Sequence, residues 1–267
     1  MSLYKSHKPR KRFGQNFLQD SFVIDQIIHA ISPSNLQTIV EIGPGQGAIT
    51  AQLLEQCQNL HLIEIDRDLI EHLQTRFSHN DHLHIHNADA LKFRFCDLAM
   101  DKKIRLVGNL PYNISTPLLF HILENSDCID DMHFMLQKEV VDRMSAEPGS
   151  KTYGRLSVMI QYHCQVESLF KVAPESFSPA PKVDSAIVRL NPYDTKPYPA
   201  KNHKLLARLV NQAFSLRRKT LRNAVKTLLD EDQIKQCGID PKLRPEMLSL
   251  EQFVCLSDLI VDDSESE

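Results

Sequence analysis

The stretch Glu41-Ile-Gly-Pro-Gly-Gln-Gly47 holds three of the eight glycines in this 267-residue chain. The apolar residues 38–42 predict a strand that leads into it, and residues 47–57 predict a helix that follows it. Glycines at such a junction permit a tight turn and let a ligand approach the backbone without meeting a Cβ atom. The stretch therefore predicts an α/β sheet with a ligand-binding loop at the carboxyl end of one strand.

Short apolar strands alternate with helical stretches around this loop. We expect strands at 60–65, 82–86, 104–107 and 132–136, and helices at 20–31 (with Asp20 as its cap), 67–77 and 116–125. Such alternation favours a parallel sheet with helices on both faces. Residues 166–172 and 183–190 predict two strands with no helix between them, which is typical of an antiparallel edge. The predicted fold class is α/β, with a doubly wound, Rossmann-like sheet.

The last quarter of the chain has a different pattern. Residues 191–203 contain Pro192, Pro197 and Pro199, which predicts a linker. Apolar residues then repeat at helical spacing from Leu205, and no strand pattern returns. The predicted organisation is an α/β domain over 1–192 with a basic N-terminal segment, a linker over 193–203, and a small all-helical domain over 204–267 with an acidic tail.

Composition excludes several classes of protein. With 42% hydrophobic and 24% charged residues, the chain is neither disordered, collagenous nor membrane-like. It has no apolar run near the roughly 18 residues of a membrane span, and no apolar stretch of the kind found in secretory signals. The two closest of its six cysteines lie 18 positions apart, which predicts no disulfide framework, and Cys57, Cys96 and Cys164 are expected in the core. We expect a soluble, reduced, cytoplasmic protein.

The basic residues are unevenly distributed. Residues 1–12 hold five Lys or Arg and no acid, residues 201–226 hold eight and no acid, and the other 229 residues carry 18 basic and 34 acidic groups. This separation favours a polyanionic partner, although a solvated basic helix and a loose tail would give the same pattern. If 201–226 is helical throughout, Arg218, Arg222 and Lys226 share one stripe. The predicted polyanion-binding residues are Arg217, Arg218, Lys219, Arg222 and Lys226.

The glycine loop fits two kinds of cofactor. Glu64 lies 21 residues after Gly43, at the end of the next predicted strand, where a carboxylate can bind both hydroxyls of an adenosine ribose. Asp89, after the following strand, can accept from an adenine amino group. The sequence Gly43-x-Gly45-x-x-Ala48 matches the fingerprint of dinucleotide-binding loops. The acidic residue Glu41, two positions before the first glycine, is common in methyltransferases that bind S-adenosylmethionine. No phosphate-binding G-x-x-x-x-G-K-[ST] sequence occurs, and the loop by itself leaves both cofactors open.

The sequence Asn109-Leu-Pro-Tyr112 favours S-adenosylmethionine. It follows the predicted strand 104–107, so it lies at the ligand edge of the sheet. The exocyclic amine of adenine is a poor nucleophile because its lone pair is delocalised into the ring. If the Asn109 side-chain oxygen and the Leu110 carbonyl accept its two N–H bonds, the nitrogen moves toward tetrahedral geometry, while Tyr112 can stack on the base. A proline turn with a buried tyrosine is the structural alternative.

With these motifs the sequence resembles the ribosomal RNA adenine dimethyltransferases, specifically their small-subunit branch. The resemblance lies in Arg12–Leu18, Glu41–Gly47, Glu64–Asp66, Asn87–Ala90, Asn109–Ser115 and Phe177–Ser185, in family order. It implies a catalytic set of Asn109, Leu110, Tyr112 and Phe177, with Phe177 and Tyr112 on either side of the target base. It implies a cofactor-binding set of Asn16, Leu18, Gly43, Gly45, Glu64, Asp89 and Asn109.

The resemblance also implies the reaction and the partner. The expected activity is S-adenosyl-L-methionine-dependent dimethylation of adenosines in a hairpin loop near the 3′ end of small-subunit ribosomal RNA, within the immature subunit. We expect a monomer with no metal and no membrane contact. His82, His84 and His86 alternate toward one strand face, which we interpret as a solvated or edge face rather than a metal site.

Three other functions stay open at this point. A methylase of large-subunit ribosomal RNA, of the macrolide-resistance type, has a closely related sequence pattern. A largely non-catalytic RNA-binding assembly factor would keep the fold, although intact Asn109, Tyr112 and Glu64 speak against it. A nicotinamide-dependent oxidoreductase would use the glycine loop but would leave Asn109–Tyr112 without a role.

Overall fold

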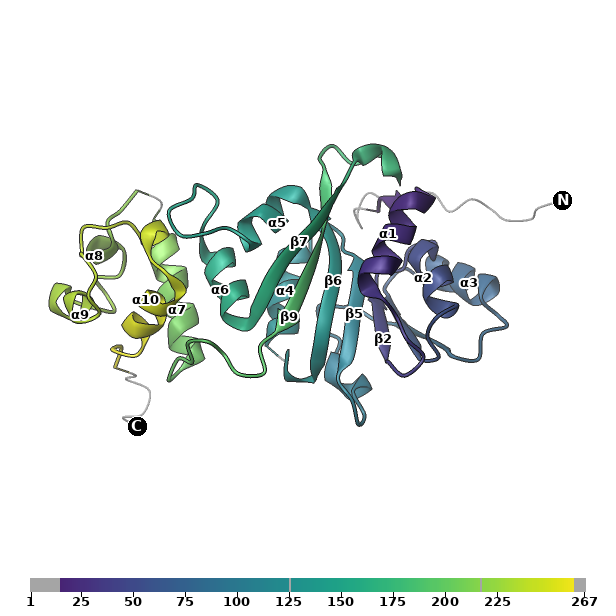
Figure 1. The fold of residues 1–267 in the computed structure, drawn as a ribbon, viewed down its shortest axis with the longest axis horizontal. Helices are drawn as coiled ribbons and strands as arrows, with labels where there is room; N and C mark the ends of the chain where they lie inside the picture. Colours follow the sequence, from purple (N-terminus) through teal and green to yellow (C-terminus); the bar gives the residue numbers. More distant parts are fainter. Residues whose placement is uncertain (1–14, 125, 217, 262–267) are drawn as a thin grey trace. The chain divides into compact units, whose positions relative to one another are not determined.

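The computed structural model describes residues 15–124, 126–216 and 218–261 (Figure 1). The basic residues of 1–12, Arg217 and the acidic end of the chain lie outside these ranges. The chain forms two compact units, one containing the residues up to 141 together with 167–192, the other containing 142–166 together with the residues from 193 onward. The first unit holds the sheet, and the second is mostly helical.

The sheet confirms the predicted fold class. It has seven strands in the order β4-β3-β2-β5-β6-β9-β7. Its strands are β2 (Ile39–Ile42), β3 (Leu60–Glu64), β4 (Leu83–Asn87), β5 (Ile104–Asn109), β6 (Ile129–Gln137), β7 (Cys164–Val172) and β9 (Ser185–Pro192). The first five strands in this order, from β4 through β6, run parallel to one another, and β9 runs antiparallel to β6. The late strands therefore form the sheet edge, as their sequence predicts.

The strand order places a ligand site between β2 and β5. From β2 the chain adds β3 and β4 on one side, then returns to add β5 and β6 on the other. Right-handed crossovers therefore place α2 (Ala48–Leu54) and α3 (Arg67–Arg76) on the face opposite α4 (Ser115–Leu123). Loops that leave the carboxyl ends of β2 and β5 diverge at this reversal, and ligands bind in the resulting crevice.

Helix α1 (Ser21–Ile31) joins the core through its apolar face. Asp20 caps it, accepting from the backbone N–H groups of Phe22 and Val23 at 3.0 and 3.3 Å, as the sequence predicts. Buried apolar side chains of α1 pack with those of β2, β3 and α2 in one cluster. The helix ends at Ser32, whose left-handed backbone (φ 48°) closes the last turn.

A buried arginine ties the end of α1 to the sheet. Arg105 on β5 is 6% exposed, and its guanidinium forms two bonds of 2.7 Å with the carboxylate of Asp131 on β6. The same guanidinium donates to the carbonyls of Ile31 and Ser32, at 2.6 and 3.3 Å, and to the side chain of Gln37 at 3.0 Å. Bidentate pairing satisfies both charges away from water. Arg105 therefore joins α1, the following loop and two strands.

A second, two-stranded sheet is absent from the sequence-based prediction. Strand β1 (Phe17–Leu18) pairs antiparallel with β8 (Phe177–Ser178), with Leu18 opposite Phe177. The carbonyl of Ser176 also accepts from the backbone of Gln19 at 2.9 Å. Two-residue strands carry too little pattern to be recognised, and their partners lie at opposite ends of the domain. The pairing fixes the N-terminal segment against the unit that contains the sheet.

The second unit is built around three helices that pack on one another. These are α6 (Arg155–His163), α7 (His203–Phe214) and α10 (Leu250–Ser257). Residues 142–166, which the sequence-based division assigns to the α/β domain, belong to this unit. The proline-rich residues after 192 also pack here, since the Ala200 N–H donates to the Tyr162 hydroxyl at 3.3 Å and Lys196 lies 4.8 Å from the centre of that ring.

The predicted basic stripe on one helix is wrong. Helix α7 ends at Phe214, and among the described residues between it and α9 (Glu231–Gln236), only the four of α8 (Leu221–Ala224) are helical. The backbone N–H groups of Leu221 and Arg222 donate to the carbonyls of Leu243 and Pro241, at 2.7 and 3.2 Å, so they cannot continue α7. Arg222 also pairs with Glu231 at 2.8 Å, whereas Arg218, Lys219 and Lys226 are exposed.

The expectation of wholly reduced cysteines is also wrong. Disulfides join Cys96 to Cys128 and Cys237 to Cys255, with Cα atoms 5.5 and 5.9 Å apart. Cys96 is therefore a bonded, half-buried residue rather than a core thiol, while Cys57 and Cys164 are buried and free as predicted. The sequence separations of 32 and 18 residues gave no indication that the chain brings these pairs together.

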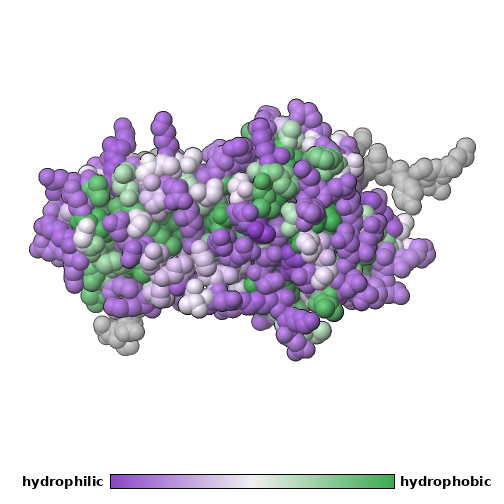
Figure 2. All heavy atoms as spheres, in the orientation of Figure 1, coloured by the Kyte–Doolittle hydropathy of each residue, from purple (hydrophilic) through white to green (hydrophobic). Residues whose placement is uncertain are grey.

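The surface is predominantly hydrophilic on the face shown in Figure 2, where apolar residues form small, separate patches. None of the helices in the described ranges combines the length and the apolar character needed to cross a membrane.

Candidate functional site

A cavity of about 290 Å³ lies at the carboxyl ends of β2, β3, β4 and β5. Its wall contains residues from each predicted cofactor motif. The predicted site residues that line it are Asn16, Leu18, Gly43, Gly45, Glu64, Asp89, Asn109, Leu110 and Tyr112. The structure therefore gathers at one place residues that lie almost a hundred positions apart in the sequence.

The glycine loop forms one wall of the cavity. Gly43, Gly45 and Gly47 all have positive φ angles, of 66°, 58° and 80°, which L side chains rarely adopt. A Cβ atom on Gly45 would lie 3.0 Å from the ring of Phe17. Glycine at this position thus permits both the turn and the close approach of the N-terminal segment.

The N-terminal segment Gln15–Leu18 forms a second wall. The Gln15 side chain donates to the Asp66 carboxylate at 3.1 Å, and the Asn16 carbonyl accepts from the Asn109 side chain at 3.0 Å. Together with the β1–β8 pairing, these contacts hold the segment beside the cavity. The sequence-based prediction included Asn16 and Leu18 but omitted Gln15 and Phe17, whose roles depend on contacts with distant residues.

The cavity wall is acidic. Its ionisable side chains are those of Glu41, Glu64, Asp89 and Tyr112, and no Lys, Arg or His occurs among the lining residues, all of which belong to the described part of the chain. A wall of this kind favours a cationic ligand and disfavours the pyrophosphate of a dinucleotide. The nicotinamide alternative therefore has little support from the electrostatics of the site.

The carboxylates of Glu64 and Asp89 are held by backbone N–H groups of the residues that follow them. One oxygen of Glu64, Oε1, accepts from the N–H groups of Ile65 and Asp66, both at 2.9 Å. Burial raises the pKa of Glu64, and these backbone bonds oppose the rise. Asp89 accepts from the backbone N–H of Leu91 at 3.0 Å. Both carboxylates keep a defined orientation at the cavity wall.

Glu41 is the most deeply buried acid of the site, with 1% of its surface exposed. Its Oε2 atom accepts from the hydroxyl of Thr50 on α2 at 2.6 Å. Burial is the main cause that raises the pKa of Glu41 to about 7; the Thr50 hydrogen bond opposes this rise, and the nearby Glu64 adds to it. Thr50 was not predicted, because nothing in the local pattern distinguishes it from any other helix residue.

This burial gives a prediction for stability. The pKa of Glu41 rises from 4.5 in the unfolded chain to about 7 in the folded protein. Its contribution to the free energy of unfolding is therefore fully present below pH 4.5 and is lost as the pH rises through 7. We expect Glu41→Gln to stabilise the ligand-free protein at pH 8 by about 3 kcal/mol and to change little at pH 4.5. Urea unfolding at both pH values measures this, and equal effects at the two would contradict it.

The residues Asn109–Tyr112 are held in place by three neighbours. The Asn109 amide nitrogen donates to Asn16, which leaves the Oδ1 atom to accept from a ligand. The Leu110 N–H donates to the Met135 carbonyl on β6 at 3.1 Å. The Tyr112 hydroxyl lies 2.6 Å from that of Ser185, a contact that was not predicted, and burial raises the pKa of Tyr112.

Phe177 differs from the other members of the predicted catalytic set. It is 5% exposed and packs in the apolar cluster that also contains Leu18 and Ile187, and the cavity wall does not include it. Its pairing with Leu18 across β1 and β8 explains this burial. A contact between Phe177 and a target base stays a prediction.

The predicted histidine face is only partly right. Strand β4 is an edge strand, but it begins at Leu83, so His82 precedes it. His82 and His84 are exposed, as predicted, whereas His86 is half-buried; His84 and His86 also contact His61 of β3, whose Nδ1 atom lies 3.0 Å from the Nε2 atom of His86. Burial lowers the pKa of His61 to about 4. Across the residues that the structure describes, no group of three or more His, Cys, Asp or Glu could hold a metal ion.

Comparison with known proteins agrees with this geometry. The profile of the family described as ribosomal RNA adenine dimethylase matches residues 6–262. A protein of Pseudomonas syringae pv. syringae named ribosomal RNA small subunit methyltransferase A is 56% identical over 255 residues, which cover 95% of each chain. A protein of the same name from Shewanella sp. is 53% identical and covers 97% of each chain.

Two solved structures share the fold over most of the chain. A dimethyladenosine transferase from Plasmodium falciparum superposes with a TM-score of 0.74 at 26% identity, covering 90% of this chain and 95% of its own. The 23S ribosomal RNA methyltransferase ErmE superposes with a TM-score of 0.73 at 23% identity, covering 91% and 98%, and shows likeness of fold.

Proposed function

Because the chain belongs to the ribosomal RNA adenine dimethylase family, we propose that its acidic cavity and Asn109–Tyr112 together dimethylate adenosine in small-subunit ribosomal RNA. The activity is that of an S-adenosylmethionine-dependent methyltransferase. Within the family, identity of 53–56% to proteins named for the small subunit favours that branch over the large-subunit branch. The observation that carries the proposal is that Asn109, whose Nδ2 atom is bonded to Asn16, lines an acidic cavity.

The cavity residues fit the cofactor. When bound, S-adenosylmethionine supplies an electrophilic methyl group on a positively charged sulfur. Glu64 would bind the ribose hydroxyls, Asp89 would accept from the adenine amine, and Gly43 and Gly45 would leave room for the methionine part. Asn16 and Leu18 would cover the cofactor from the N-terminal segment, which the bonds of Gln15 and Asn16 hold in place.

Asn109 and Leu110 would prepare the target amine. The Oδ1 atom of Asn109 and the carbonyl of Leu110 accept its two N–H bonds, which localises the lone pair on nitrogen and directs it at the methyl group. As the nitrogen gains positive charge, the same oxygens stabilise it, and the ring of Tyr112 can stack on the base. Because these atoms lie inside a pocket, the adenosine must be unpaired or turned out of its helix.

Labelled methyl transfer tests this function. Incubated with labelled cofactor and separate undermethylated subunits, the protein is expected to label adenosine of the small subunit and not of the large one. Label confined to the large subunit would support the macrolide-resistance type of enzyme. Absence of label from both, with RNA still bound, would support the non-catalytic assembly factor.

Loss of Glu64 is expected to weaken cofactor binding. Glu64→Ala removes the charged acceptor proposed for the ribose and should cost about 1–3 kcal/mol of binding free energy, measured by calorimetry. Because Glu64 also accepts from Ile65 and Asp66, Glu64→Gln serves as a control that keeps an oxygen for those bonds. Unchanged affinity in the alanine variant would contradict the ribose role.

The basic residues of the helical unit are proposed to contact RNA phosphates. Arg218, Lys219 and Lys226 are exposed and are not joined by a helix, whereas Arg222 is paired with Glu231. Replacing the three exposed residues by Gln should weaken subunit binding. It should also reduce the slope of the logarithm of the binding constant against the logarithm of the salt concentration, by about 0.7–0.9 for each phosphate that is no longer neutralised. A control triple of Lys171, Lys235 and Arg244, each paired with an acid, should change the slope little. Equal slopes for both triples would contradict the assignment.

We propose further that the target adenosines lie in a hairpin loop near the 3′ end of the RNA and are modified on the immature subunit in the cytoplasm. The protein would act as a monomer. Sedimentation of the free protein, and methylation of immature against mature subunits, test these points. In the cytoplasm both disulfides would face a reducing environment.

A further inference from the structure

The acids of the cavity have no basic partner among the lining residues, and Glu41 is the one most shielded from water. It lies on β2, an interior strand of the sheet, so solvent cannot compensate its charge. The groups that face it are few: Glu64 of β3, the Thr50 hydroxyl of α2, and the Cys57 thiol beyond α2. Burial raises the pKa of Cys57 to about 11, so this thiol stays neutral.

A buried carboxylate without a cation is unfavourable as an anion. S-adenosylmethionine brings a cation in its sulfonium group, whereas its product S-adenosylhomocysteine has a neutral sulfur. The two molecules otherwise share the same adenosine and amino-acid groups. A buried carboxylate in the wall can therefore distinguish them by charge, which contacts to the adenosine cannot do.

We propose that Glu41 is a charge-sensing residue that favours the sulfonium-bearing cofactor over its neutral product and releases its proton when that cofactor binds. The proposal rests on the cofactor assigned under the proposed function and extends it to product release. After methyl transfer the carboxylate loses its counter-charge, which weakens retention of S-adenosylhomocysteine. The Thr50 hydroxyl, 2.6 Å away, helps keep the carboxylate ionised.

Calorimetric titration of the full-length protein with each nucleoside tests the proposal. With the pKa of Glu41 at about 7, the affinity for S-adenosylmethionine should rise about tenfold from pH 6 to pH 8, whereas that for S-adenosylhomocysteine should change less. Buffers of different ionisation enthalpy should show a proton released at pH 6. Glu41→Gln should lose this pH dependence and narrow the affinity ratio of the two nucleosides.

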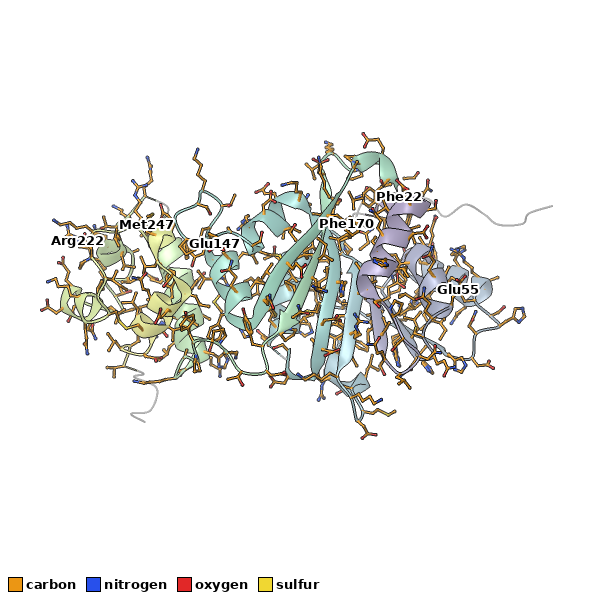
Figure 3. All side chains as sticks on the ribbon, viewed as in Figure 1. Phe22, Glu55, Glu147, Phe170, Arg222 and Met247 are labelled. Atoms are coloured by element: carbon orange, nitrogen blue, oxygen red, sulfur yellow. A yellow bond between two sulfur atoms is a disulfide. The ribbon has the colours of Figure 1, made fainter. Side chains whose placement is uncertain are left out.

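Two further variants make the test specific. Glu55→Gln removes an acid at the exposed end of α2 (Figure 3) and should behave like the parent. Thr50→Val removes a bond that lowers the pKa of Glu41, so it should move the midpoint of the pH dependence upward.

A parent-like pH dependence and affinity ratio in Glu41→Gln, or an unmoved midpoint in folded Thr50→Val, would overturn the proposal. If the parent binds both nucleosides with equal affinity, charge sensing by Glu41 is contradicted while the cofactor assignment stands. Failure of the parent to bind either nucleoside would contradict the cofactor assignment and this proposal together.

Discussion

Replacing Asn109 with alanine is expected to slow methyl transfer by about 10²–10³-fold. In the proposed reaction the side-chain oxygen of Asn109 is the acceptor that both localises the lone pair of the target amine and stabilises its developing charge. Its amide nitrogen is already committed to the Asn16 carbonyl at 3.0 Å, so this orientation is set before any ligand arrives. Single-turnover rates with labelled cofactor and undermethylated small subunits measure the effect.

Binding measurements separate this role from a structural one. Subunit binding by the Asn109→Ala variant should stay within about twofold of the parent, because the phosphate contacts proposed above use Arg218, Lys219 and Lys226 instead. Asn109→Asp keeps an oxygen but cannot donate to Asn16, so it should retain part of the activity while loosening the N-terminal segment. Parent-like turnover in Asn109→Ala would remove Asn109 from the reaction.

Replacing Arg105 with alanine is expected to destabilise the sheet-containing unit by about 3–5 kcal/mol. The change leaves the half-buried Asp131 carboxylate without its arginine partner and removes the donors to Ile31 and Ser32 at the end of α1. Urea unfolding followed by circular dichroism measures the loss. A cost below about 1 kcal/mol would show that the network contributes little.

A double variant tests the cause of that loss. Arg105→Met combined with Asp131→Leu removes both charges and keeps apolar volume in the same place. Because a buried ion pair can often be exchanged for apolar residues at little cost, the double variant should be more stable than Arg105→Ala. If the two are equally unstable, the hydrogen bonds to α1, rather than the unpaired charge, account for the effect.

The parts of the site that are predictable from sequence are those that local chain geometry determines. Each predicted motif lies at or just after the carboxyl end of a strand: Gly43 and Gly45 follow one strand, Glu64 ends the next, and Asn109–Tyr112 lies at the end of a third. A parallel sheet brings these strand ends to the same edge, even where the predicted strand bounds are inexact. Thr50 and Gln15 could not be predicted in this way. Their roles depend on contacts with Glu41 and Asp66, which the fold places beside them.

The errors in the fold have similar causes. Helix α6 (Arg155–His163) is absent from the sequence-based prediction, because it is buried nearly all round and shows no clear apolar period to distinguish it from a core strand. The basic segment after α7 has helical composition, but Leu221 and Arg222 donate to the distant residues Leu243 and Pro241 and therefore do not continue α7. The cysteine pairs likewise depend on packing of segments that are remote in sequence.

The most direct test of the central claim is nucleoside mass spectrometry of small-subunit RNA after reaction with the protein and S-adenosylmethionine. We expect N6,N6-dimethyladenosine to appear in RNA from undermethylated subunits, to lie in fragments near the 3′ end, and to be strongly reduced with Asn109→Ala. Unmodified adenosine throughout that RNA, with the cofactor and the subunit both bound, would contradict the account.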